Sequence, residues 1–168
     1  YTADQTAQLE THQFAHLLVE TTGNQLTITL NRPEKKNAMS PLLMNELAFA
    51  LTHAYYNRNI WAVVIAAKGD VFCAGADLKA FAGEVQTITS TIPEPQGEVV
   101  LGNLFAGLHK PCIAKVQGPV YAGGFLIICG CTHVVAVEEA TFSLPEVKRG
   151  IWKKKKKKSM LHVMPPRQ

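Results

Sequence analysis

A short, continuous apolar run constrains the fold of this chain more than any other feature of its sequence. Residues 61–66 read Trp-Ala-Val-Val-Ile-Ala, and a β-branched run of this length is typical of a strand buried on both faces of a parallel sheet. Before it, residues 40–56 repeat apolar side chains at helical spacing, and residues 25–30 alternate apolar and polar side chains like a half-buried strand. Strand, helix and strand in this order imply a right-handed crossover, so we expect an α/β fold.

The same alternation continues along the rest of the chain. Thr21-Thr-Gly-Asn24 is typical of a hairpin turn, and Ser40 followed by Pro41 is typical of a helix start, because the hydroxyl can cap the first turn. Residues 81–97 contain two prolines and little periodicity, which predicts a loop. Further strands are expected at residues 16–20, 112–116 and 133–137, and further helices at residues 99–109 and from Gly123 onward.

Composition excludes several classes of protein. The chain has 168 residues, of which 47% are apolar, and this suits one domain with its own core rather than a disordered chain. Six of the seventeen basic residues form one run, Lys153–Lys158, and the rest of the chain carries a small net negative charge. We therefore expect no nucleic-acid partner.

The apolar runs and the cysteines indicate where the protein is located and whether it binds a metal. No apolar run reaches the roughly 18 residues that a membrane span needs, and the N-terminal residues lack the order of a signal peptide. We expect no membrane span and a location in the cytoplasm or an organelle matrix. The four cysteines lie in apolar segments, and no second Cys/His pair accompanies Cys129-Gly-Cys131, so free thiols and no metal site are expected.

The first candidate site is Phe72-Cys-Ala-Gly-Ala-Asp-Leu78, which follows the buried strand. Glycine between small alanines lets a ligand approach the backbone closely, and the passage from strand to helix leaves N–H groups free to donate. The alternative is an ordinary connection between a strand and a helix, which the spacing alone favours.

The second candidate is Gly118-Pro-Val-Tyr-Ala-Gly-Gly124, which again lies between a strand and an apolar helix. Its paired glycines would present N–H groups at the positive end of the helix dipole, where negative charge developing on an oxygen is stabilised. The stretch matches neither the dinucleotide-binding pattern nor the phosphate-binding loop, so hydride transfer and nucleotide hydrolysis are not supported.

The third candidate is Glu146, which follows a predicted strand and Pro145. A carboxylate held there in an apolar wall would have a raised pKa and could transfer protons. The alternative is an exposed surface glutamate.

Four stretches of the chain resemble the signatures of the crotonase superfamily, which contains the enoyl-CoA hydratases and isomerases, in that family's order and spacing. They are Asn31-Arg-Pro-Glu-Lys-Lys-Asn-Ala-Met39, Phe72-Cys-Ala-Gly-Ala-Asp-Leu78, Lys110-Pro-Cys-Ile-Ala-Lys-Val-Gln-Gly118 and Thr141-Phe-Ser-Leu-Pro-Glu-Val147. The resemblance covers nearly all of the chain from about His16 onward and implies a spiral of ββα units. It also implies an acyl-CoA substrate, no cofactor beyond the coenzyme A of that substrate, and a homo-oligomer built from trimers.

By motif position, the resemblance assigns two oxyanion-hole amides to Ala76 and Gly123, where they would polarise the thioester carbonyl. Residues 76–79 would line the CoA thioester, and Lys35 or Lys36 would lie near its phosphates. The full set of expected substrate-binding residues is Lys35, Lys36, Ala38, Ala74, Ala76, Asp77, Leu78, Lys79, Gly123 and Gly124.

Hydratases of this family use two glutamates, and this chain matches one of them. Glu146 stands at the second glutamate position, whereas Leu126 stands at the first. One carboxylate can take a proton from one carbon and return it to another through a dienolate, so the resemblance favours double-bond isomerisation. Hydration of a 2-enoyl-CoA and non-catalytic binding of an acyl-CoA are the alternatives.

The resemblance divides the chain into a polar N-terminal arm at residues 1–15, a crotonase-like core at residues 16–152, and an altered C-terminal start at residues 153–168. Lys153–Lys158 stand where the family has a helix that begins with proline. The run is either a native charged tract, which could bind polyanions, or a block that replaces the native residues, and its unchanged length favours replacement. Family members usually continue well beyond this point, so we expect the C-terminal helical part to be missing.

Overall fold

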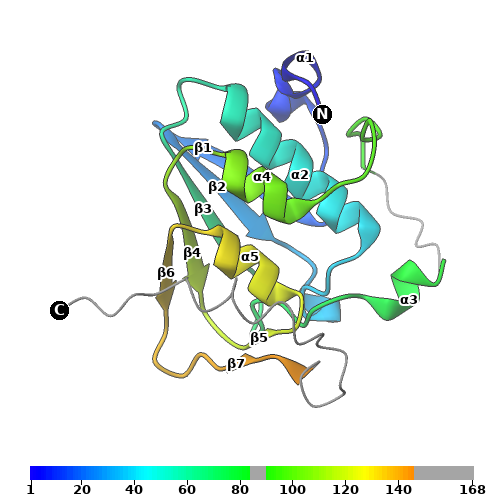
Figure 1. The fold of residues 1–168 in the computed structure, drawn as a ribbon, viewed down its shortest axis with the longest axis vertical. Helices are drawn as coiled ribbons and strands as arrows, with labels where there is room; N and C mark the ends of the chain where they lie inside the picture. Colours follow the sequence, from blue (N-terminus) through cyan, green and yellow to red (C-terminus); the bar gives the residue numbers. More distant parts are fainter. Residues whose placement is uncertain (84–89, 146–168) are drawn as a thin grey trace.

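A five-stranded, mostly parallel sheet forms the centre of the fold (Figure 1). The computed structural model describes residues 1–83 and 90–145. The first two strands pair antiparallel as a hairpin, and each later strand is added in parallel, which confirms the predicted α/β class. In spatial order the strands are β1 (Leu17–Thr22), β2 (Gln25–Leu30), β3 (Ala62–Ala67), β4 (Cys112–Val116) and β6 (His133–Ala136).

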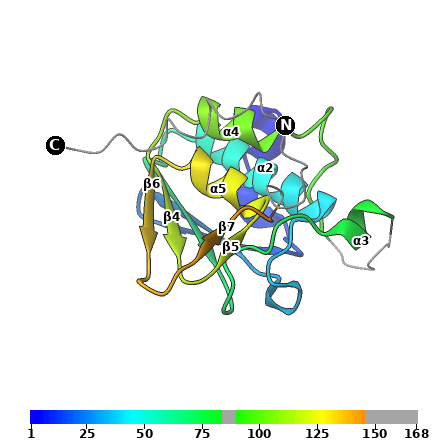
Figure 2. The ribbon, with the colours of Figure 1, turned by 60° about the horizontal axis from the view of Figure 1, so that its bottom comes forward.

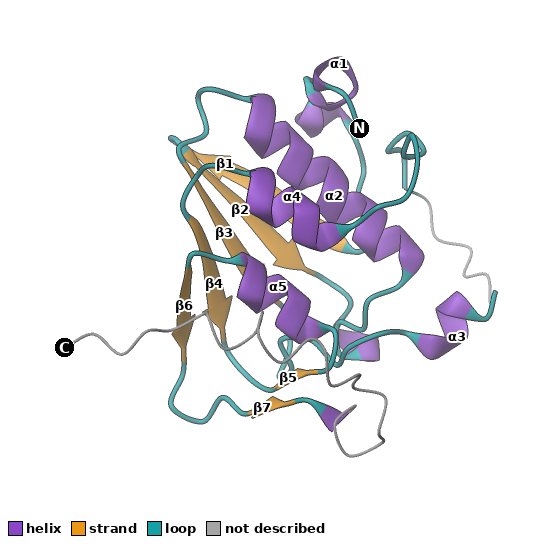
Figure 3. Cartoon of the chain, in the orientation of Figure 1, coloured by secondary structure: helices purple, strands orange, loops and turns teal. Residues whose placement is uncertain are grey.

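Three helices connect the parallel strands and lie side by side on one face of the sheet (Figure 1, Figure 3). They are α2 (Pro41–Tyr56), α4 (Leu101–Gly107) and α5 (Gly124–Gly130). Helix α2 begins as predicted, because the Ser40 hydroxyl accepts a hydrogen bond from the Leu43 N–H at 3.1 Å. The remaining helical turns in the described part of the chain are α1 (Ala3–Thr6), η1 (Leu9–Thr11), η2 (Pro33–Lys35) and α3 (Leu78–Phe81).

The hydrophobic core lies between this face of the sheet and the helices. Alternate residues of β2 are fully buried and belong to the same cluster as the buried side chains of α2. Strand β3 differs from its prediction, since Val63 and Ile65 are buried whereas Val64 is only partly buried. The prediction of burial on both faces holds for one face only, because the three crossover helices all lie on that face.

Residues 1–15, expected as a polar arm, pack against α2. The Thr2 hydroxyl and the Gln5 side chain form a capping box that starts α1. The Tyr1 ring meets the ring of the fully buried Phe49 edge to face, with centroids 5.1 Å apart. The Thr6 carbonyl lies 2.6 Å from a ring nitrogen of His53, so the arm is joined to the core by polar as well as apolar contacts.

A buried carboxylate ties the end of this arm to α2. Both oxygens of Glu46 accept backbone N–H groups, from Ala15 at 2.6 Å and from His16 at 2.9 Å. Burial nevertheless raises the pKa of the Glu46 carboxyl, because desolvation penalises its charged form more than these hydrogen bonds favour it.

Two further strands, β5 (Val120–Tyr121) and β7 (Phe142–Ser143), form a small parallel pair apart from the main sheet (Figure 2). Two residues are too few to give a periodic pattern, so β5 was not predicted, and a strand before Pro145 was expected only without bounds. Their pairing brings residues 141–143 beside the loop that leads into α5. Of the loop predicted at residues 81–97, residues 84–89 lie outside the described part of the chain.

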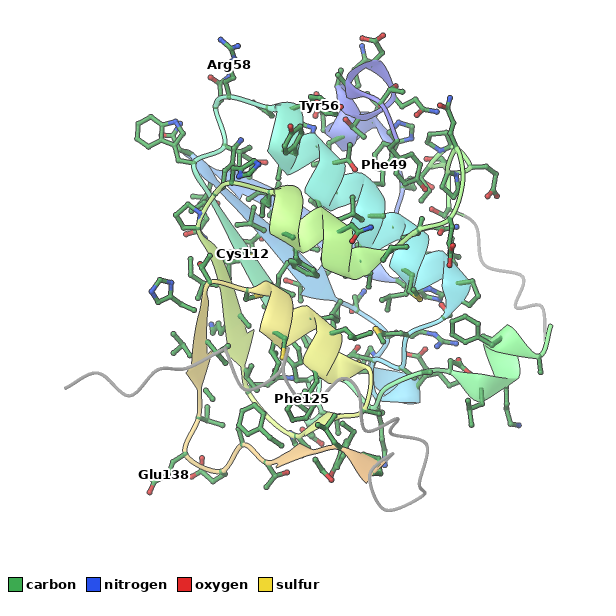
Figure 4. All side chains as sticks on the ribbon, in the orientation of Figure 1. Phe49, Tyr56, Arg58, Cys112, Phe125 and Glu138 are labelled. Atoms are coloured by element: carbon green, nitrogen blue, oxygen red, sulfur yellow. The ribbon has the colours of Figure 1, made fainter. Side chains whose placement is uncertain are left out.

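Phe49→Ala is expected to lower the free energy of unfolding by about 3–5 kcal/mol, because it empties a fully buried aromatic site. The matched control is Tyr56→Ala on the same helix, whose side chain is 49% exposed and whose loss should cost about 1 kcal/mol or less. Both side chains are labelled in Figure 4. Urea unfolding measures the two values, and equal losses would contradict this account of the core.

Candidate functional site

Three loops meet beyond the carboxyl ends of parallel strands and form the candidate site. They comprise residues 36–39 after β2, residues 72–77 after β3 and residues 119–123 after β4. Backbone hydrogen bonds along both edges hold the second loop between the other two. Ligands of open α/β sheets are usually bound at these ends of the strands.

Met39 fixes the direction of the Ala76 N–H group. The Met39 N–H donates to the Gly75 carbonyl at 2.7 Å, and the Met39 carbonyl accepts the Asp77 N–H at 2.9 Å. The Gly75 carbonyl and the Ala76 N–H belong to one trans peptide group and therefore point in opposite directions. The Ala76 N–H thus points away from Met39, and no described residue accepts a hydrogen bond from it.

The loop before α5 brings a second N–H group close to the first. A Cβ atom placed on Gly75, whose φ is +95°, would lie only 3.3 Å from the Gly123 nitrogen and 2.6 Å from the Ala122 Cβ. A Cβ placed on Gly123 would lie 3.7 Å from the Ala76 nitrogen. Within residues 1–83 and 90–145 the Gly123 N–H has no acceptor either, so two N–H donors on neighbouring loops are available to a ligand.

Ala122 takes a left-handed conformation, with a φ of 49°, directly before Gly123. This conformation is unfavourable for a residue with a Cβ. It is held in place by the pairing of β5 with β7, in which the Ala122 N–H donates to the Ser143 carbonyl at 3.0 Å. The turn that presents the Gly123 N–H is therefore supported from residues 141–143.

A buried polar network lies beneath the loops. The Arg32 side chain is 1% exposed, and its Nη1 donates to Asp77 Oδ2 at 2.6 Å and to the Ala38 carbonyl at 3.1 Å. The Asn37 amide donates to two carbonyls within residues 68–71, each at 2.8 Å. The hydrogen bond from the Arg32 guanidinium holds the pKa of the Asp77 carboxyl below its ordinary value.

Comparison with known proteins identifies the family of this chain. The family model described as enoyl-CoA hydratase/isomerase matches residues 20–164. The chain belongs to this family. The resemblance carried by the four sequence signatures is thereby confirmed.

Individual relatives agree with the assignment. The mevalonyl-coenzyme A hydratase of Aspergillus fumigatus is 39% identical over 136 residues, which cover 77% of this chain and 47% of the relative. The enoyl-CoA hydratase EchA19 of Mycobacterium tuberculosis is 36% identical over 137 residues, which cover 80% of this chain and 51% of the relative. The chain spans about half the length of the curated relatives it matches.

Solved structures support the crotonase-like fold. The crystal structure of an enoyl-CoA hydratase/isomerase from Mycobacterium paratuberculosis aligns with a TM-score of 0.72 at 30% identity. The alignment covers 91% of this chain and 59% of the other. The fold class predicted from the four signatures is confirmed.

Apart from Asp77, the substrate-binding residues expected from the family signatures fall into two groups. One group lines the meeting point of the three loops, and it consists of Ala38, Ala74, Ala76, Gly123 and Gly124. The other group is exposed around that point, with Lys35 and Lys36 at the end of η2 and Leu78 and Lys79 on α3.

The Asp77 side chain is bonded to other residues of the protein, and its expected contact with substrate stays a prediction. Its Oδ1 accepts the Ala80 N–H at 3.1 Å and caps α3, while its Oδ2 pairs with Arg32. The importance of Arg32 and Asn37 was missed at the sequence level. The only signal was their place in the stretch Asn31–Met39, which did not reveal that both side chains are buried.

Glu146 lies outside the described residues, so its role stays a prediction. The chain leading to it is described, and its residues 141–143 lie beside the loop that carries Gly123. Leu126 lies in the first turn of α5, with its N–H donating to the Gly123 carbonyl at 2.9 Å and its side chain 50% exposed. Lys153–Lys158 also fall outside the described part.

Among the described residues, Cys73 is the cysteine of the three loops, and its thiol is not suited to nucleophilic chemistry. Burial raises the pKa of the Cys73 thiol to about 11, which keeps it protonated and weakly nucleophilic at neutral pH. Within residues 1–83 and 90–145, no three His, Cys, Asp or Glu side chains are grouped so as to hold a metal ion.

Within residues 1–83 and 90–145, no helix has the length and apolar character needed to cross a membrane.

Gly75→Ala is expected to destabilise the protein more than Gly83→Ala. Both glycines have positive φ, +95° and +89°, but a Cβ on Gly83 would meet nothing within 4 Å. The control therefore reports backbone strain alone, and the collision with Ala122 should cost about 1–3 kcal/mol more. Urea unfolding measures the difference, and equal free energies of unfolding would contradict the close approach of the two loops.

Proposed function

We propose that this protein is an enzyme that binds an acyl-CoA thioester and stabilises its enolate on the N–H groups of Ala76 and Gly123. The observation that carries the proposal is that these two N–H groups lie on adjacent loops and have no acceptor among the described residues. Family membership supplies the substrate class, since the relatives are named as hydratases of CoA esters.

The proposed chemistry begins at the thioester carbonyl. When a base removes a proton from the neighbouring carbon, negative charge develops on the carbonyl oxygen. Two N–H donors that point at this oxygen from fixed loops stabilise the enolate without having to reorganise. Removal of one such donor typically lowers kcat by about 10²–10³-fold in other enzymes.

We propose Glu146 as the group that moves the proton. It follows residues 141–143, whose pairing with β5 brings this part of the chain to the Gly123 loop. Leu126 cannot exchange protons, so the first glutamate position of the hydratases contributes no acid or base here. A single carboxylate suffices to take a proton from C2 of a 3-enoyl-CoA and return it to C4, which favours isomerisation.

Hydration of a 2-enoyl-CoA is the second candidate function, and the names of the relatives favour it. It requires another residue to supply the acid or base that Leu126 does not. Non-catalytic binding of an acyl-CoA is a third possibility that the same substitution raises.

The exposed basic residues beside the loops suit the rest of the substrate. Lys35 and Lys36 are exposed, and the Lys36 carbonyl accepts the Ala74 N–H at 3.0 Å, so these ammonium groups belong to the rim of the site. We propose that they attract the phosphates of coenzyme A. The proposed reaction needs no cofactor beyond this coenzyme. We also propose that the protein forms a homo-oligomer built from trimers. Its proposed location is the cytoplasm or an organelle matrix.

Paired assays of the full-length protein with 3-enoyl-CoA and 2-enoyl-CoA substrates test the proposed reaction. We expect double-bond migration to exceed hydration, and Glu146→Gln to lower migration by about 10²–10⁴-fold, the usual contribution of general acid–base catalysis. Hydration at a good rate would overturn the preference for isomerisation. Binding of both esters without turnover would favour the non-catalytic alternative.

Leu126→Glu is expected to raise the rate of 2-enoyl-CoA hydration, because it restores a carboxylate one turn after Gly123. The side chain is 50% exposed, so a charged group there need not be desolvated. Leu126→Gln is the matched control, since glutamine has nearly the same shape as glutamate and cannot transfer protons. We expect a gain of at least about tenfold over that control. The same rate in both variants would show that this position does not control hydration.

A further inference from the structure

We infer that Arg32 is a positioning residue, which aims the Ala76 N–H at the substrate through its ion pair with Asp77. The inference rests on the proposed function, because it assigns a role within the same oxyanion-binding site. Arg32 is too deeply buried to touch substrate itself, with 1% of its side chain exposed.

Arg32 is fixed to the main sheet at its own backbone. It follows the end of β2 by two residues, its N–H donates to the Asn37 side chain at 2.9 Å, and its carbonyl accepts the Asn37 N–H at 2.9 Å. The Asn37 amide is in turn bonded to the chain that follows β3. The guanidinium therefore extends from a rigid base that joins two neighbouring strands.

The far end of the guanidinium holds the residue next to Ala76. Nη1 contacts Asp77 Oδ2 at 2.6 Å, while the other carboxylate oxygen of Asp77 caps α3. The same nitrogen donates to the Ala38 carbonyl at 3.1 Å, on the neighbouring loop. One side chain thus spans both loops whose pairing orients the Ala76 N–H.

Stability alone does not require an ion pair in this place. Desolvation of two charges offsets most of their attraction, and well-packed apolar residues often serve stability equally well. A planar guanidinium, however, holds two acceptors in fixed directions, and apolar packing cannot fix the positions of two loops in this way. Small displacements of a catalytic group matter, since a shift of about 1 Å can lower a rate by about 10²-fold.

Isotope-edited infrared spectroscopy tests whether the Ala76 N–H points at the thioester carbonyl of the substrate. The probe is a bound, unreactive acyl-CoA whose thioester carbonyl carries ¹³C. In the full-length wild-type protein, the two N–H donors should shift the carbonyl stretch to lower frequency. We expect Arg32→Met to lose most of this shift and to lower kcat by about 10–100-fold, with KM and the ester Kd changed by less than about threefold. Arg32→Lys keeps the charge without the planar fork, so it should restore part of both signals.

Asp77→Asn separates the ion pair from the helix cap. Asparagine is as good an N-cap as aspartate, so α3 keeps its cap while the charge opposite Arg32 is lost. We expect an intermediate loss of carbonyl shift and kcat. The matched control is Arg58→Met, since Arg58 is exposed and lies before β3, at the opposite ends of the strands from the site (Figure 4).

Unpaired buried charges can prevent folding, so the double variant Arg32→Met/Asp77→Asn, which removes both charges together, completes the series. It should fold and still lack the carbonyl shift. Normal shift and kcat in folded Arg32→Met or in the folded double variant, with only a lower Tm, would overturn the positioning role. A wild-type protein that binds the ester without any carbonyl shift would instead overturn the proposed oxyanion site, and the positioning role with it.

Discussion

The loop after β3 has hydrogen-bond partners along both of its edges, and the site takes its geometry from this double pairing. On one edge it bonds to residues 36–39, and on the other to residues 119–121. Buried backbone groups must be paired in a stable protein, so nearly every N–H of such a loop is committed. The Ala76 N–H is the exception that the pattern itself creates, because the carbonyl of the same peptide group faces Met39.

The sheet determines where these loops can meet. Each loop follows the carboxyl end of a parallel strand, and neighbouring parallel strands lie about 5 Å apart. The pairing of the strands therefore brings the loops together, although the buried side chains of the strands take no part in the proposed chemistry. Small residues then allow the loops to approach closely, and the polar side chains that hold them, Arg32 and Asn37, are buried below the loops.

Local patterns predicted the main elements, and long-range pairing decided what they missed. Helix α2 and strand β2 have clear periodicities and a recognisable start at Ser40, and both were predicted with nearly the observed bounds. Strands β5 and β7 have two residues each and exist only because they pair with each other across twenty or so residues of chain. Likewise, no local pattern shows that Arg32 meets a carboxylate 45 positions later.

The site was only partly visible in the sequence for the same reason. Spacing alone favoured an ordinary turn around Ala76, and the pairing of Ala76 with Gly123 came from the family signatures rather than from composition. The structure places both residues on adjoining loops. It also gives Asp77 a structural role that a motif, which lists residues without their partners, could not distinguish from contact with substrate.

The pairing of β5 with β7 has a consequence for the order in which the protein is assembled. The β1–β2 hairpin joins residues close in sequence and can form while the chain is still short, because closing a short loop costs little entropy. The turn at Ala122 is supported by Ser143, so it gains its native partner only after the chain beyond β6 has been made. The sheet can thus be well advanced before the site exists, and a partly synthesised chain would have the scaffold without the means to bind an oxyanion.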